Sequence, residues 1–216
     1  MQDLVRVTGL ILKSEPVSDY DRRIVILTRE RGKITAFAKG ARRPNSRYVA
    51  VTSPFSFGEL RLIEGRNAYN LMEADIKNYF EELRTDFEGA YYGIYFCDIA
   101  DYYGRENNDE RELLKLLYMS LKALTKDSIP HKLVRYIYEL KAIMVNGEFP
   151  GLPLDRLYND STLYAVQFIE QTPVEHLFTF NVNEYVLSEL AWIAEKTRKR
   201  CIDRTLKSLE ILESIC

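Results

Sequence analysis

Alternation of apolar and polar residues is the main feature of the first 75 residues. Short runs rich in β-branched and aromatic residues follow one another here, and turn residues separate them. In the first run, Val5, Val7 and Ile11 fall on one side of an extended strand. The five runs are LVRVTGLIL, RRIVILT, KITAFA, FSFGELRLI and AYNLMEA. Five such strands in so short a stretch predict a small closed barrel.

Two of the connections between these runs predict tight hairpins. In Glu30–Lys33 and in Glu64–Asn67 a glycine, Gly32 or Gly65, stands where a left-handed residue is needed. The barrel that these strands suggest is the oligonucleotide-binding (OB) fold, which often carries a helix after its third strand. The segment Lys39–Val51 has no room for that helix, so a loop is predicted there.

Beyond Asp75 the apolar spacing changes to that of helices. Leu113, Leu117, Leu121 and Leu124 fall on one helical face, for example. Caps and breakers predict helices over residues 109–124, 128–146, 161–172, 183–200 and 203–214. The expected fold class is therefore α+β: a five-stranded OB-fold barrel in residues 1–80, followed by an all-helical domain in residues 81–216.

Charge divides the chain in the same way. The net charge is only −2, yet residues 1–80 hold 14 Lys and Arg against 9 Asp and Glu, whereas the remainder holds 16 against 23. A basic front and an acidic rear predict two surfaces for two kinds of partner.

Several classes of protein are disfavoured by the sequence. No long apolar run and no signal-peptide pattern is present, so we expect a cytoplasmic protein, associated with the nucleoid if it binds DNA. The three scattered cysteines predict reduced thiols, with no metal and no other cofactor. The two histidines, His131 and His176, belong to no catalytic motif, and no phosphate-binding loop follows Gly32-Lys33, so we expect no enzyme.

The strongest functional signal is a run of cations between Arg29 and Arg47, in which Glu30 is the only acid. Cations on a hairpin and the loop beside it are suited to following a phosphate backbone without reading bases, although a merely solvated loop would have the same composition. The predicted DNA-binding residues are Arg29, Arg31, Lys33, Lys39, Arg42, Arg43 and Arg47, and the alternative path runs over Arg22 and Arg23.

Aromatic residues of the barrel are candidates for stacking on bases. Phe37, Phe55, Phe57 and Tyr69 are of this type. For Phe55 and Phe57, which share one face of the predicted strand, packing in the core is the favoured interpretation.

At this point the sequence resembles the RecO family of recombination mediators. The resemblance covers GLILKSEPVSDYDRRIVILTRERGKITAFAKGARRPNSRY near the N-terminus, NGEFP and TPVEHLFTF in the middle, and RTLKSLEIL at Arg204–Leu212. It implies a barrel that binds single- and double-stranded DNA and a helical domain that docks the RecR partner. It also implies strand annealing and help in loading RecA onto DNA coated by single-strand-binding protein.

The resemblance further implies a pocket for the C-terminal tail of single-strand-binding protein. The basic cluster Lys196, Arg198, Lys199 and Arg200, in the last turn of a predicted helix, is the candidate, although cations also suit a helix end for electrostatic reasons. Many family members carry a four-cysteine zinc module, but residues 144–180 hold no cysteine, so zinc is expected to be absent. A general single-strand or RNA-binding protein, an adaptor whose barrel binds protein, and an enzyme are the competing hypotheses.

Overall fold

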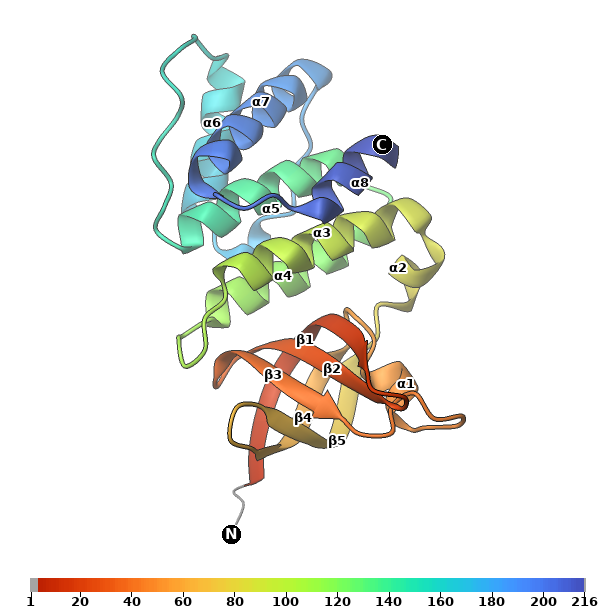
Figure 1. Ribbon diagram of the computed structural model, residues 1–216. Helices are drawn as coiled ribbons and strands as arrows, with labels where there is room; N and C mark the ends of the chain where they lie inside the picture. Colours follow the sequence, from red (N-terminus) through yellow and green to blue (C-terminus); the bar gives the residue numbers. More distant parts are fainter. Residues whose placement is uncertain (1–3, 216) are drawn as a thin grey trace. The chain divides into compact units, whose positions relative to one another are not determined.

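The computed structural model describes residues 4–215, and the chain divides into two compact units (Figure 1). The barrel unit consists of Met1–Thr85 together with Ala100–Leu114, and the helical unit consists of Asp86–Ile99 and Lys115–Cys216. The chain therefore leaves the barrel unit, returns to it and leaves again. Whether residues 1–80 form a domain by themselves stays a prediction. Among the helices of the described residues, none has the length and apolar character needed to cross a membrane.

The barrel is closed and has five strands. They are β1 (Leu4–Val17), β2 (Asp21–Thr28), β3 (Gly32–Ala38), β4 (Phe57–Glu64) and β5 (Tyr69–Asn78). Their order around the barrel is β1-β2-β3-β5-β4, and β4 pairs with β1 to close it. Only the short β3–β5 pairing is parallel. The predicted OB-fold barrel followed by helices is thus confirmed, although β5 continues to Asn78, three residues beyond the predicted start of the helical pattern.

Alternation along the strands places the apolar residues inside the barrel. Val7 and Ile11 of β1 lie in its core, as predicted, with residues from each of the other strands. Each such side chain contributes about 1.5–3 kcal/mol through burial. The remaining core residues include Ile24, Ile26, Ile34, Ala36, Leu60, Leu62, Tyr69 and Leu71.

The two predicted hairpins exist, but only one uses a left-handed glycine. Gly32 has a φ of +64°, as expected between β2 and β3. Gly65, by contrast, is not among the residues with positive φ, so that prediction is wrong. Its N–H donates to the carbonyl of Ala68 at 3.0 Å, and a Cβ atom at Gly65 would lie 2.5 Å from that same oxygen. The glycine is needed here for close approach of the backbone.

The prediction of a pure loop over Lys39–Val51 is also wrong, because a one-turn helix, α1 (Tyr48–Val51), lies there. Its anchor is Tyr48, which packs against the barrel core and donates its hydroxyl to the carbonyl of Met72 at 2.7 Å. Thr52 ends the turn by donating its N–H and hydroxyl to the carbonyl of Tyr48. A single turn needs far less chain than the longer helix considered from the sequence.

Residues 100–114 cover one end of the β2–β3 hairpin. The N–H of Lys33 donates to the carbonyl of Arg105, and the N–H of Asn107 donates to the carbonyl of Arg31, both at 2.9 Å. Leu27 is fully buried, and a Cβ atom at Gly104 would come within 3.1 Å of it. The side chain of Leu27 is therefore closed to solvent.

Seven helices of at least one turn follow the barrel. They are α2 (Glu81–Thr85), α3 (Phe87–Tyr103), α4 (Arg111–Leu124), α5 (His131–Val145), α6 (Asp160–Gln171), α7 (Glu184–Cys201) and α8 (Lys207–Ile215), with a 3₁₀ turn at Val174–His176. Within the described residues, the last five match the predicted helices to within four residues at each end, and the largest difference is that α8 begins at Lys207 instead of residue 203. Helix α3 was not predicted, because its tyrosines and apolar residues surround the helix instead of forming one stripe.

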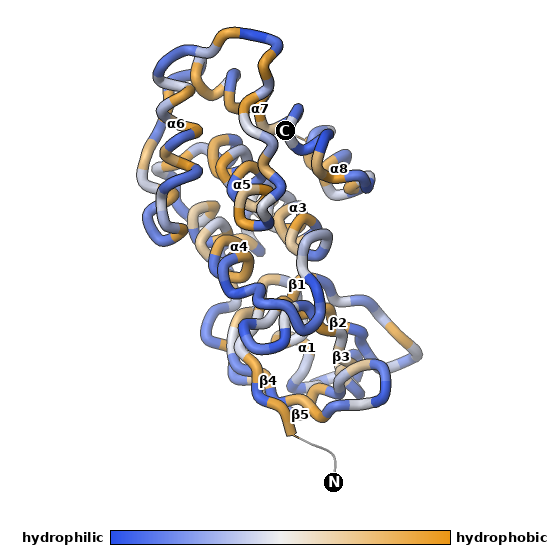
Figure 2. The backbone as a smooth tube through the Cα atoms, turned by 90° about the vertical axis from the view of Figure 1, so that its left-hand side faces the viewer, coloured by the Kyte–Doolittle hydropathy of each residue, from blue (hydrophilic) through white to orange (hydrophobic). Residues whose placement is uncertain are grey.

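Helix α5 is the centre of the helical unit and contacts both α6 and α7. Figure 2 shows hydrophobic and hydrophilic residues alternating along these helices, as expected for elements with one buried face. Tyr138 of α5 is fully buried, stacks on Phe96 and donates its hydroxyl to the carbonyl of Phe96 at 2.8 Å. Lys141 donates its ammonium group to the carbonyls of Ile169, Glu170 and Thr172 and so caps α6.

Candidate nucleic-acid interface

Two loops meet at the end of the barrel where β2 begins and β3 ends. The N–H of Arg42 donates to the carbonyl of Tyr20 at 2.8 Å, and the N–H of Gly40 donates to the Asp21 carboxylate at 2.7 Å. The Arg42 guanidinium also donates to the carbonyl of Ser18 at 3.0 Å. These bonds fix the β3–α1 loop against the β1–β2 loop, so that both form one surface.

Four of the predicted DNA-binding residues lie on this surface, which we call the loop surface: Lys39, Arg42, Arg43 and Arg47. All four are exposed. Lys39 makes no hydrogen bond or ion pair with any residue between Leu4 and Ile215. No carboxylate of the described part of the chain forms an ion pair with the three arginines. Their charges are therefore available to an external anion.

Aromatic rings support two of these arginines. The Arg43 guanidinium carbon lies 5.4 Å from the centre of the Tyr20 ring, and that of Arg47 lies 4.9 Å from the centre of the Tyr48 ring. Arg47 also donates to the carbonyl of Met72 at 3.0 Å. Contacts of this kind orient a guanidinium without neutralising it. Tyr20 is itself 51% exposed, which makes it available for stacking on a base.

The other three predicted cations lie at the opposite end of the β2–β3 hairpin, which we call the hairpin end: Arg29, Arg31 and Lys33. Strand β2 separates the two groups by about 24 Å, given roughly 3.3 Å per residue. Arg29 forms an ion pair with Glu30 at 3.1 Å, and Lys33 is bound to Asp101. The seven predicted residues therefore do not form one patch.

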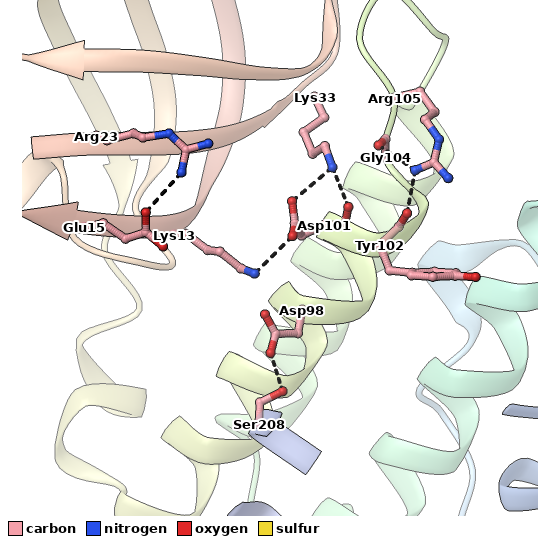
Figure 3. Close-up of polar contacts among 10 residues, drawn as sticks. All are labelled: Lys13, Glu15, Arg23, Lys33, Asp98, Asp101, Tyr102, Gly104, Arg105 and Ser208. Carbon is pink, nitrogen blue, oxygen red and sulfur yellow. Dashed lines mark hydrogen bonds and ion pairs between the residues drawn. The ribbon is translucent and has the colours of Figure 1, made fainter. Parts of the chain in front are cut away.

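Asp101, from the end of α3, binds two lysines of the barrel (Figure 3). Lys33 and Lys13 each donate to its carboxylate at 3.0 Å. Burial by itself would raise the pKa of Asp101, but the hydrogen bonds from both lysines outweigh that effect and hold the pKa below its usual value. Lys33 is thus engaged inside the barrel unit.

The alternative path over Arg22 and Arg23 is also partly occupied. Arg22 donates to the Ser14 hydroxyl at 3.0 Å. Arg23 forms an ion pair with Glu15, also at 3.0 Å (Figure 3). Both contacts lie across the β1–β2 pairing. Of the three groups of cations, those of the loop surface are therefore the least neutralised by acidic partners.

The aromatic candidates divide by burial. Phe55 and Tyr69 are each 5% exposed, so their rings are closed to stacking, whereas Phe37 and Phe57 are half-buried. Phe55 precedes β4 and has a φ of +73°, so it does not share a strand face with Phe57 as predicted. Sequence reasoning missed Tyr20, which stands between Asp19 and Asp21 in the sequence and is brought to the basic loop only by the fold.

The basic cluster predicted to bind a partner lies in the last turn of α7. Lys199 is bound to Glu195, and the Lys196 ammonium lies 5.4 Å from the centre of the Trp192 ring. Arg198 is half-buried and its Nε atom has no hydrogen-bond partner. Arg200 is exposed.

A pocket of about 670 Å³ lies elsewhere in the helical unit, between the first turns of α6 and α7. Apolar side chains such as Phe168, Phe180 and Val186 line it. The basic cluster lies at the other end of α7, and an 18-residue helix is about 27 Å long. The structure therefore does not bring this pocket and the basic cluster together.

The cysteines of the described residues are free thiols. Cys97 is buried, and Cys201 is half-buried with its pKa raised by burial. Cys216 lies outside the described residues. Within residues 4–215 no group of three His, Cys, Asp or Glu side chains is arranged to hold a metal ion.

Two family models match successive parts of the chain. The family model described as Recombination protein O N terminal matches residues 1–80, and Recombination protein O C terminal matches residues 84–152. The DNA repair protein RecO of Acetivibrio thermocellus is 26% identical over 98% of this chain and 97% of its own length. That of Symbiobacterium thermophilum is 35% identical over 69% of this chain and 59% of its own length.

The A. thermocellus alignment is 244 positions long, although this chain has only 216 residues. The relative therefore carries segments that have no counterpart here.

Proposed function

Because the chain belongs to the RecO family of DNA repair proteins, we propose that it is a non-catalytic mediator of recombinational repair that binds single- and double-stranded DNA through its barrel. It anneals complementary strands and, with RecR, helps to load RecA onto DNA coated by single-strand-binding protein. The observation that carries the proposal is the loop surface, where Lys39, Arg42, Arg43 and Arg47 stand exposed without acidic partners.

The chemistry of that surface suits strand annealing. Exposed cations neutralise phosphates and release condensed counterions, which gives affinity without reading base edges. Two strands held by their phosphates at one surface repel each other less and keep their bases free to pair. No bond is made or broken, so no catalytic group and no nucleotide hydrolysis is required. The protein acts in the cytoplasm, at the nucleoid where its substrate lies.

A strand-annealing assay tests this function. Complementary fluorescent strands, each coated with the cognate single-strand-binding protein, are mixed with the full chain in the absence of nucleotide. We expect annealing to be faster than without protein, and DNA to be preferred over RNA of the same sequence. Equal action on RNA would favour a general single-strand-binding protein, and a requirement for ATP would contradict a non-catalytic role.

We assign the tail of single-strand-binding protein to the basic cluster Lys196, Arg198, Lys199 and Arg200, and the docking of RecR to the helical unit. The assignment of the tail site is supported by the exposed charges of Lys196 and Arg200, which suit an acidic peptide. Trp192 is the only tryptophan and lies beneath Lys196, so its fluorescence reports on this site. A tail peptide should change that fluorescence, and Lys196→Ala with Arg200→Ala should weaken binding. Unchanged binding by this double variant would move the site elsewhere.

The third part of the proposal is that the protein works without zinc. Residues 144–180, where many family members carry four cysteines, contain none. Elemental analysis after dialysis should find no stoichiometric zinc, and chelation should leave the melting temperature unchanged. One zinc per chain would contradict this expectation.

A further inference from the structure

A polar pocket of about 370 Å³ lies at the hairpin end of the barrel unit, between β3, the β4–β5 turn and the chain after α3. Its volume falls in the range of roughly 300–1,000 Å³ typical of sites for small ligands. Its polar lining residues include Thr35, Glu64, Arg66, Asn67, Tyr69 and Glu106. None of the functions assigned above uses this pocket.

Tyr69 is the most informative of these residues. Its side chain is only 5% exposed and belongs to the barrel core, yet the residue also lines the pocket. Burial, followed by the charge of Glu64, raises its pKa, and the charges of Arg31 and Glu106 also act on it. Its hydroxyl has no hydrogen-bond partner among residues 4–215. This hydroxyl is not among the fully buried side-chain atoms that lack a partner, so it is reached from the pocket, where a ligand or water can supply its partner.

The walls of the pocket are fixed before any ligand arrives. The chain after α3 is held to the hairpin by the bonds from Lys33 to Arg105 and from Asn107 to Arg31 described above. Close packing of Gly65 on Ala68 fixes the opposite turn. Such a site orders few groups when a ligand binds, which favours affinity.

The charges of the pocket exclude a bare phosphate as its main ligand. Lys33 is neutralised by Asp101, and the Arg105 guanidinium is held at the end of α3 by the carbonyls of Tyr102 and Tyr103. Arg66 is exposed without a partner in the described chain, but Glu64 and Glu106 lie on the same pocket and repel anions. A ligand with both donors and acceptors on one planar edge suits this mixture better.

A nucleobase with an exocyclic amino group has such an edge. Carboxylates accept hydrogen bonds from the amino group of cytosine, whereas thymine presents a carbonyl oxygen at the same position. Arg66, Asn67 and the Tyr69 hydroxyl supply donors for the ring nitrogen and carbonyl of the base. We propose that this pocket holds one unpaired nucleobase bearing an exocyclic amino group, with cytosine preferred over thymine. The inference rests on the proposed DNA binding and adds a base-selective subsite to it.

Nuclear magnetic resonance of the full chain tests the location. Deoxycytidine monophosphate should shift the amide signals of Gly65 and Gly104, which line the pocket, and thymidine monophosphate should shift them much less. A ten-residue cytosine oligonucleotide should shift these signals and that of Gly40 on the loop surface. Selective shifts with the oligonucleotide alone would still support the pocket and would show that the strand delivers the base.

The two proposals fail in distinguishable ways. If the oligonucleotide shifts Gly40 but not Gly65 or Gly104, the base-selective pocket is wrong while the loop surface stands. If cytosine and thymine compounds shift the pocket glycines equally, base selection is wrong. If Gly65 and Gly104 respond and Gly40 does not, the pocket stands and the loop surface is wrong.

Tyr69→Phe tests the chemistry, because it removes the hydroxyl and keeps the ring that packs in the core. We expect affinity for the cytosine oligonucleotide to fall about threefold to tenfold, the effect of one lost hydrogen bond, while affinity for thymine changes less. Glu106→Gln should narrow the preference for cytosine by about threefold, since an amide also donates to thymine. Tyr164→Phe, at an exposed tyrosine of the helical unit, is the matched control and should change neither affinity. Loss of affinity equally for both oligonucleotides in Tyr69→Phe, or no loss at all, would overturn the proposal.

Discussion

The loop surface and the hairpin end carry the same kinds of residue from the same stretch of sequence, yet the structure gives them different surroundings. On the loop surface, Arg43 and Arg47 lie over tyrosine rings, which orient the cations and leave their charge in place. At the hairpin end, Lys33 is neutralised by Asp101. A basic residue in the sequence therefore contributes positive potential to the surface only where the fold places no carboxylate beside it.

The largest effect on DNA binding is expected when Arg42, Arg43 and Arg47 are replaced together by alanine. Each neutralised phosphate contributes about 0.7 to the slope of log affinity against log salt, so the slope should flatten by roughly 2. Affinity for a single strand near 0.1 M salt should then fall about 100-fold. Titrations by fluorescence anisotropy at several salt concentrations measure both quantities.

Stability is the control for this variant. Arg42 donates a hydrogen bond to the loop carbonyl of Ser18 and Arg47 donates one to the carbonyl of Met72 in β5, both at exposed positions, so the triple change should cost no more than about 2 kcal/mol and leave the fold intact. A variant that melts normally and keeps both its affinity and its salt slope would show that DNA follows another path, over Arg22 and Arg23 for example.

Replacing Lys33 by alanine should affect stability more than DNA affinity, the opposite of what is expected for the triple variant. We expect a loss of stability of about 1–2 kcal/mol, because Asp101 loses one of its two lysine partners in a half-buried site. Affinity for DNA should change little. Chemical denaturation and anisotropy on the same sample measure the two effects. A large loss of affinity at unchanged stability would place Lys33 in the DNA interface and would break the comparison.

The pH dependence of Asp101 gives a smaller effect. Because its pKa is lowered in the folded protein, its contribution is present at neutral pH and is lost as the pH falls through the lowered folded-state pKa. Asp101→Asn should therefore cost about 1 kcal/mol at pH 7, and the difference from the wild type should shrink below about pH 4. Denaturation curves at pH 7, 5 and 3.5 measure this. A difference that grows towards low pH would contradict the assigned ion pairs.

The smallest effect is expected for Arg29→Ala. Arg29 is exposed and paired with Glu30, and exposed pairs contribute about 0–1 kcal/mol. We expect stability to change by less than about 0.5 kcal/mol and affinity for DNA by less than twofold. A loss of affinity comparable to that of Arg43→Ala would place Arg29 among the phosphate contacts.

The fold could be predicted largely from the sequence, since β-rich runs between turn residues located all five strands, and apolar stripes, caps and breakers located α4 to α8. The misses have local causes. Helix α3 has no single apolar face, and α1 depends on the hydrogen bond from the Tyr48 hydroxyl to the carbonyl of Met72 in β5, which is distant in the sequence. The charge pattern indicated the basic loop. It could not indicate which cations were neutralised, because Asp101 is 68 residues from Lys33 in the sequence.

Residues 100–114 have a consequence for how the chain is made. They complete the barrel unit, burying Leu27 and binding Lys33, yet they follow the barrel strands and most of α3 along the chain. During synthesis from the N-terminus, the strands therefore emerge before the segment that covers them. Until this segment has left the ribosome, Leu27 on the β2–β3 hairpin lacks part of its cover and is open to chaperones and to unwanted association.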